Sequence, residues 1–162
     1  MLIVGGGCRG RELAAAMVTQ GHAVRITTRT ESGRAAIEAV GAECWIGTPD
    51  RLATLRGALE NVTVLCWLMG STAGSTEELE ALHGTRLEFF LTQAIDTTVR
   101  GFIYEAAGTR TPPELLRAGE HRARALVERN AIPAVFLDAD PAVGGAWLAQ
   151  ARTAVQSLLA PA

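Results

Sequence analysis

The sequence contains no lysine, and all fifteen of its basic residues are arginine. Seventeen acidic residues oppose them, so the net charge of −2 is too balanced for a protein that neutralises many phosphates of a nucleic acid. Long apolar runs are also missing. The longest one, Val64 to Met69, is far shorter than the ~18 residues that a membrane-spanning helix needs. We therefore expect neither a nucleic acid nor a membrane as a partner.

Cysteine is scarce, and the three present, Cys8, Cys44 and Cys66, show no C-x-x-C spacing. An odd number of cysteines without that spacing predicts neither a disulfide framework nor a zinc site. The chain opens on a short apolar run and three glycines, and it shows no charged and apolar regions typical of a signal peptide. These features predict a cytoplasmic protein without a bound metal.

Short apolar runs, rich in β-branched residues, alternate with segments of helical periodicity along the 162 residues. Such alternation specifies a parallel sheet covered by helices, because each crossover returns the chain across the sheet. We predict an α/β fold: a doubly wound parallel sheet of order 3-2-1-4-5-6 in three α/β/α layers. The chain should be one Rossmann-type domain over residues 1–162, without a separate substrate domain. The expected strands are Leu2 to Val4, Ala23 to Thr28, Cys44 to Ile46, Val62 to Leu68, Gly101 to Tyr104 and Ala134 to Leu137.

Three segments carry clear helix signals. An apolar stripe with three- and four-residue steps predicts one long helix from Thr76 to Asp96. The Thr-Pro-Pro-Glu sequence at 111–114 is typical of an N-cap and capping box, and it predicts a helix that ends near Asn130. Asp140 before Pro141 repeats this start signal for a last helix.

A glycine-rich turn follows the first expected strand. Gly5, Gly7 and Gly10 match the spacing G-x-G-x-x-G, with Cys8 and Arg9 inside the turn. In this motif the first glycine allows a tight turn, the second lets a diphosphate approach the backbone, and the third lets helix and strand pack closely. The helix amides would then hold the diphosphate. The motif predicts dinucleotide binding, and the alternative is a glycine turn without a ligand.

The residues after the second strand indicate which dinucleotide is bound. A site selective for NAD places an acidic residue here to bind the ribose hydroxyls, whereas this chain has Thr28 and then Arg29. An arginine fork suits the 2′-phosphate of NADP, and Arg9 and Arg34 would add positive charge nearby. We predict NADP(H) rather than NAD(H). The alternative is that Arg29 and Arg34 are solvated surface charges.

Several motifs together resemble the short-chain dehydrogenase/reductase superfamily, especially its extended and atypical branches. Gly84-Thr85-Arg86 is similar to the family's G-T-x-N helix, and residues 97–104 are similar to the strand that follows it. The resemblance runs from Leu2 to about Pro141. It implies that Thr48 lies near the adenine. It also implies that Leu68, Met69 and Gly70 lie near the ribose and nicotinamide.

The family's catalytic residues have no counterparts in this sequence. Family members use a tyrosine and a lysine in Y-x-x-x-K, with a serine or threonine after the fifth strand. The resemblance places Leu116, Glu120 and either Ala106 or Ala107 at these positions. The single tyrosine, Tyr104, lies in the fifth strand instead. The usual acid/base mechanism is therefore not expected.

Other candidate residues are few. Glu105 follows the fifth strand at the ligand-binding edge and is the best candidate for an acid or base, while Asp138 is a weaker substrate-site candidate. Ser71 is expected to bind phosphate or to cap the next helix. The three scattered histidines are expected to have surface or capping roles. Successive apolar residues at 89–91 predict that the long helix pairs in a homodimer.

Three functions are compatible with these patterns. The chain is either a nucleotide-binding sensor or regulatory module, or a reductase that takes its proton from solvent or Glu105. In both cases the partner is the NADP(H) cofactor. In the third alternative the domain has lost cofactor binding and serves as an interaction or structural partner. The sequence names no substrate.

Overall fold

A computed structural model of the chain describes residues 1–5 and 7–160. It contains a six-stranded, fully parallel sheet of order β3-β2-β1-β4-β5-β6, which confirms the predicted topology. β1 pairs with both β2 and β4, so the strand order reverses there, where open sheets of this type bind ligands. The strands are β1 (Leu2–Val4), β2 (Arg25–Thr28), β3 (Glu43–Ile46), β4 (Val64–Trp67), β5 (Gly101–Glu105) and β6 (Ala134–Leu137).

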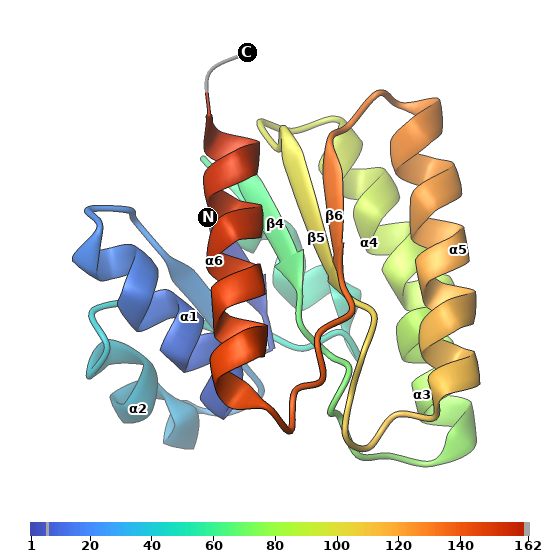
Figure 1. Ribbon diagram of the computed structural model, residues 1–162, viewed down its shortest axis with the longest axis horizontal. Helices are drawn as coiled ribbons and strands as arrows, with labels where there is room; N and C mark the ends of the chain where they lie inside the picture. The colour runs from blue at the N-terminus through green and yellow to red at the C-terminus, as the bar shows by residue number, and fades with distance from the viewer. Residues whose placement is uncertain (6, 161–162) are drawn as a thin grey trace.

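Helices cover both faces of the sheet and give the three layers seen in Figure 1. On one face, α1 and α6 pack over Ile3, Cys66 and Ile103. On the other, α3, α4, α5 and η2 enclose a second apolar cluster that contains Trp67 and Phe90. The helices are α1 (Cys8–Thr19), η1 (Glu31–Gly33), α2 (Arg34–Glu38), η2 (Leu52–Leu59), α3 (Thr76–His83), α4 (Thr85–Ile95), α5 (Pro113–Arg129) and α6 (Gly144–Leu159).

The prediction of one helix from Thr76 to Asp96 is wrong, because the segment forms two helices that meet at Gly84. Gly84 has φ −115° and ψ −107°, which is not helical. A Cβ at this position would lie 2.5 Å from the Glu80 carbonyl oxygen, so the bend requires glycine. The apolar stripe continues through the bend because both helices bury residues in one cluster. Periodicity therefore could not reveal the break.

Two predicted helix starts are also wrong. Pro112, not Thr111, is the N-cap of α5. The buried Thr111 hydroxyl instead lies 3.5 Å from the Met69 carbonyl oxygen and 3.4 Å from that of Thr72. The last helix, α6, begins at Gly144 rather than after Asp140. In both places the polar side chain stabilises a loop at the carboxyl edge of the sheet instead of a helix end.

Candidate functional site

The turn between β1 and α1 has the geometry that the glycine motif predicts. A Cβ on Gly5 would lie 2.3 Å from the Leu68 carbonyl oxygen, and a Cβ on Gly10 would lie 2.2 Å from the Gly5 carbonyl oxygen. Gly5 also has φ +125°, a conformation that favours glycine. At Gly7 a Cβ would meet nothing within 4 Å. Gly5 and Gly10 therefore permit close packing, whereas Gly7 leaves open space beside the backbone; Gly6 lies outside the described residues.

The N-terminus of α1 has no side-chain cap. Its N-cap residue, Gly7, offers no side chain, and no acidic residue lies in the first turn. The first N–H groups of a helix lack intrahelical partners, and the helix dipole gives this end a partial positive charge. Because Gly7, Cys8, Arg9 and Gly10 line a cleft, these amides have the location of a phosphate cradle.

The cleft has a volume of about 540 Å³ and runs along the carboxyl ends of β1, β4 and β5. A second hollow of about 230 Å³ adjoins it at the ends of β2 and β3, and Gly5, Arg29 and Met69 line both. Together the two hollows span the point where the strand order reverses. The predicted residues that line one or both are Gly5, Gly7, Cys8, Arg9, Gly10, Thr28, Arg29, Leu68, Met69, Ser71 and Glu105.

Three other predicted residues do not line either hollow. Arg34 forms ion pairs with Glu31 in the preceding η1 and with Glu38 at the end of its own helix, α2. Thr48 donates a hydrogen bond to Asp50 Oδ2, at 3.2 Å, while its neighbours in the loop line the smaller hollow. Gly70 is buried, and its N–H donates a hydrogen bond to Glu105 Oε2.

Arg29 lies at the boundary between the two hollows and is largely exposed. Its Nη2 atom is 3.5 Å from Asp50 Oδ2, and Arg86 Nη1 is 2.6 Å from Asp50 Oδ1. An exposed ion pair of this kind contributes about 0–1 kcal/mol. The Arg29 guanidinium is therefore easily released to another anion. Sequence reasoning missed Asp50 and Arg86 because they come from separate segments.

The acid/base candidate Glu105 is buried at the floor of the cleft, at the end of β5. Its side chain is 2% exposed, and its Oε2 accepts a hydrogen bond of 2.6 Å from the Gly70 N–H. Its Oε1 lies 3.5 Å from Arg9 Nε. Burial raises the pKa of Glu105, although the Gly70 N–H and the Arg9 guanidinium oppose this rise.

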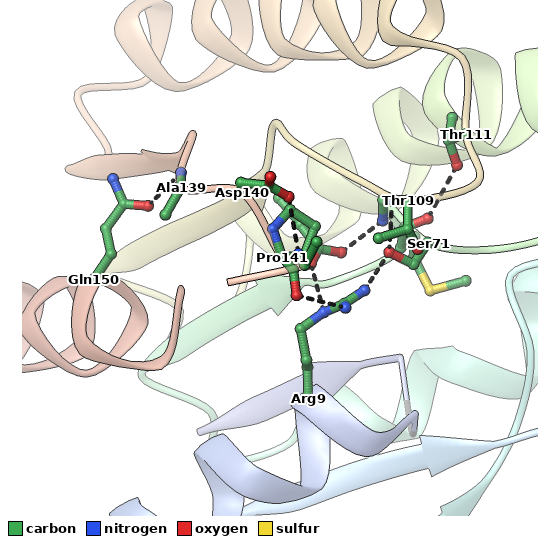
Figure 2. Close-up of polar contacts among 12 residues, drawn as sticks. Arg9, Ser71, Thr109, Thr111, Ala139, Asp140, Pro141 and Gln150 are labelled. Atoms are coloured by element: carbon green, nitrogen blue, oxygen red, sulfur yellow. Dashed lines mark hydrogen bonds and ion pairs between the residues drawn. The ribbon is translucent and has the colours of Figure 1, made fainter. Parts of the chain in front are cut away.

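Arg9 connects the glycine turn to three other loops. Its Nη2 donates to the Ser71 hydroxyl and its Nη1 to the Pro141 carbonyl at 3.4 Å, and Figure 2 shows it reaching from α1 between these two loops. Ser71 in turn accepts a 3.1 Å hydrogen bond from the Thr109 N–H. The loops after β4, β5 and β6 are thus joined at one guanidinium. The adjacent helix is capped by Ser75 rather than Ser71.

The remaining polar candidates at this edge have partners away from the cleft. Asp138 accepts a 2.6 Å hydrogen bond from Gln150 Nε2 on α6. Asp140 accepts one of 2.8 Å from the Ala142 N–H.

In the part of the chain that the structure describes, no group of three or more His, Cys, Asp and Glu side chains is placed to hold a metal ion. The described helices include none that is long and apolar enough to cross a membrane.

His83 lies in the core, so the expected surface or capping role is wrong for this histidine. It is 1% exposed, and its Nδ1 is 2.8 Å from the Tyr104 hydroxyl oxygen. That hydroxyl donates its proton to the Leu116 carbonyl at 3.2 Å. Burial lowers the pKa of His83 to about 4 and raises the pKa of Tyr104. Tyr104 is packed under α5, and it is not among the residues that line the cleft.

Comparison of the sequence with protein-family profiles and with curated proteins finds no match. Solved structures with the same fold do match. A short-chain dehydrogenase/reductase superfamily protein from Agrobacterium tumefaciens with bound NAD is 20% identical, with a TM-score of 0.67 over 83% of this chain and 47% of that one. The fold is that of the short-chain dehydrogenases/reductases.

Two further structures with this reductase fold support the same assignment. Citrobacter sp. triphenylmethane reductase complexed with NADP(H) is 16% identical, with a TM-score of 0.60 over 84% of this chain and 48% of that one. UDP-glucose 4-epimerase from Thermotoga maritima is 13% identical, with a TM-score of 0.67 over 83% of this chain and 53% of that one. The chain spans about half the length of these structures.

Proposed function

We propose that this chain is an NADP(H)-binding domain of the reductase fold. The observation that carries the proposal is the uncapped N-terminus of α1, where Gly7 leaves open space beside a cleft of about 540 Å³. A nucleotide diphosphate fits such a site because amide N–H groups and the helix dipole stabilise its charge. Neighbours in the structural comparison are described as bound to NAD or NADP(H), which supports the same cofactor class.

The preference for NADP(H) over NAD(H) rests on Arg29. The residue follows β2 at the boundary of the two hollows, and the carboxylate that now faces it is Asp50, at 3.5 Å. A 2′-phosphate carries more charge than this carboxylate and accepts a bidentate hydrogen bond from the guanidinium. Arg29 would therefore bind the phosphate of NADP(H). The proposed site does not use Arg34, which is held by two glutamates.

A sensor or regulatory role fits the cleft better than standard reductase chemistry. When bound, the nicotinamide would supply a hydride, but the family reaction also needs a proton donor. By the family resemblance, the positions of the tyrosine and lysine fall on Leu116, which is buried, and Glu120, which pairs with Arg124. Glu105 is the one carboxyl group among the residues lining the cleft. If the chain reduces a substrate, Glu105 or water is the proton source, and the raised pKa of Glu105 supports that alternative.

Thermal unfolding with NADPH, with NADH and without nucleotide tests the cofactor proposal. At 100 times its dissociation constant, a ligand stabilises the folded state by about 2.7 kcal/mol, or about 8 °C for a chain of this length. We expect this shift with NADPH and a smaller one with NADH at the same concentration. Arg29→Asp should abolish or reverse the preference, whereas Arg34→Asp, the matched control, should retain it.

Two outcomes contradict parts of this proposal. If neither nucleotide changes the melting temperature, the domain does not bind the cofactor, and the structural or interaction role becomes the better explanation. If both nucleotides bind but Arg29→Asp leaves their ratio unchanged, Arg29 is not the phosphate ligand. Oxidation of NADPH by an added carbonyl compound, lost in Glu105→Gln, would favour the reductase over the sensor.

A further inference from the structure

Arg9 and Glu105 form an ion pair at the floor of the cleft, and the two side chains differ in exposure. The side chain of Arg9 is 24% exposed and that of Glu105 is 2% exposed. Arg9 Nε and Glu105 Oε1 are 3.5 Å apart, yet neither atom makes a hydrogen bond. Both residues line the cleft. Arg9 is therefore the more accessible of the two side chains, and a ligand in the cleft reaches it more readily than it reaches the carboxylate.

The other charged residues that line the cleft do not offset Arg9. Arg29 and Arg110 are also positive, so three arginines face one carboxyl group. Asp50, 3.5 Å from Arg29, neutralises part of the Arg29 charge at the boundary between the two hollows. An arginine in a protein keeps its proton at any ordinary pH. The floor of the cleft near Arg9 is therefore a region of positive potential.

The topology indicates which part of a dinucleotide would meet this region. A doubly wound sheet consists of two mononucleotide-binding halves, and the diphosphate lies between them at the N-terminus of α1. Arg29 follows β2 in the first half. Glu105 ends β5 and Ser71 follows β4, so Arg9 reaches into the second half. If NADP(H) binds as proposed above, with Arg29 on its 2′-phosphate, the nicotinamide occupies the half that contains Arg9.

We propose that Arg9 makes the site selective for the redox state of the cofactor, so that the domain binds NADPH in preference to NADP+. The two forms carry the same phosphates and differ by one positive charge on the nicotinamide ring. A fixed guanidinium beside that ring repels the oxidised form and leaves the reduced form unaffected. This inference rests on the proposed cofactor site and assigns that site a role in sensing the reduced cofactor.

The surroundings of the pair support a fixed charge. Arg9 is tied to Ser71 and to Pro141, and its guanidinium carbon lies 5.7 Å from the centre of the Trp147 ring. The side chain is therefore held by three segments and cannot easily turn away from a ligand.

The test compares dissociation constants for NADPH and NADP+ by calorimetric titration. We expect the wild-type protein to bind NADPH about tenfold more tightly, as one partly shielded charge at this range implies. In Glu105→Gln, which keeps an oxygen for the Gly70 N–H, the ratio should rise because Arg9 loses its counter-charge. In the double variant Arg9→Met with Glu105→Gln, which buries no unpaired charge, the ratio should fall to about one.

The matched control is Arg29→Met, which should weaken both redox forms and leave their ratio unchanged. Melting temperatures without nucleotide check that each variant folds. An unchanged ratio in the double variant, or equal affinities in the wild type, overturns the inference while cofactor binding stands. Failure of the wild type to bind either form overturns the proposed function and this inference together, so the two failures are distinguishable.

Discussion

The buried histidine of α3 should make the stability of the protein depend on pH. His83 is 1% exposed, and burial lowers its pKa from an ordinary 6.5 to about 4 in the folded protein, despite the Met69 carbonyl, which acts in the opposite direction. Below about pH 6.5 the unfolded chain therefore binds a proton at this position that the folded protein does not bind. The contribution of His83 to the free energy of unfolding is therefore fully present above about pH 6.5 and is lost as the pH falls toward about 4.

The two pKa values set the size of the effect. At about pH 5 the unfolded chain is almost fully protonated at His83 while the folded protein is almost fully neutral, so the free energy of unfolding is lower by about 2 kcal/mol than at pH 7.5. For a chain of this length, about 2 kcal/mol corresponds to about 6 °C in melting temperature. Glu105 acts in the opposite direction, because its raised pKa lets the folded protein bind a proton at a higher pH than the unfolded chain does.

Urea unfolding of the wild type and of His83→Gln, at pH 5 and at pH 7.5, isolates the histidine. Glutamine can still bond to the Tyr104 hydroxyl but does not titrate, and Glu105 contributes equally to both proteins. We expect the loss of stability between the two pH values to be about 2 kcal/mol smaller in His83→Gln. His121→Gln removes an exposed histidine of α5 and serves as the control. Equal pH dependence in the wild type and His83→Gln would refute the reasoning.

Three further predictions concern the glycine turn, the core and the predicted dimer. A Cβ on Gly7 would lie in open space, so Gly7→Ala should keep the wild-type melting temperature but should no longer be stabilised by NADPH. A Cβ on Gly10 would collide with the backbone, so urea unfolding of Gly10→Ala should show a loss of about 1–3 kcal/mol of stability. Phe90→Ala removes a fully buried ring and should cost about 3–5 kcal/mol by the same measurement. Phe89 is 52% exposed. Light scattering should find a dimer for the wild type and a monomer for Phe89→Glu. A monomeric wild type would contradict the predicted homodimer.

Much of the architecture follows from local sequence patterns. The alternation of apolar strands and amphipathic helices predicts the parallel sheet, and the observed strand order agrees with it. The spacing of Gly5, Gly7 and Gly10 likewise predicts the close approach of helix and strand. These features are readable because each depends on residues within one turn, one strand or one helix. The break at Gly84 could not be predicted from apolar periodicity, because both helices bury their apolar residues in the same cluster.

The floor of the site was decided by tertiary structure. Arg9 was expected to contribute charge for phosphates, but it lies against Glu105 and reaches the carbonyl of Pro141, 132 residues along the chain. Local pattern gives no signal for such contacts, because they exist only after the loops following β4, β5 and β6 meet at one edge of the sheet. The burial of His83 against Tyr104 has the same origin.

The sequence by itself predicted the turn and the helix N-terminus that would hold a dinucleotide diphosphate, since both are properties of one continuous segment. It also placed Arg29 beside that turn through the position of β2. Only the tertiary structure decided which charges face one another across the cleft. The physical reason is that the energy of a charge depends on its distance from other charges and on its burial, and both are set by packing between distant segments.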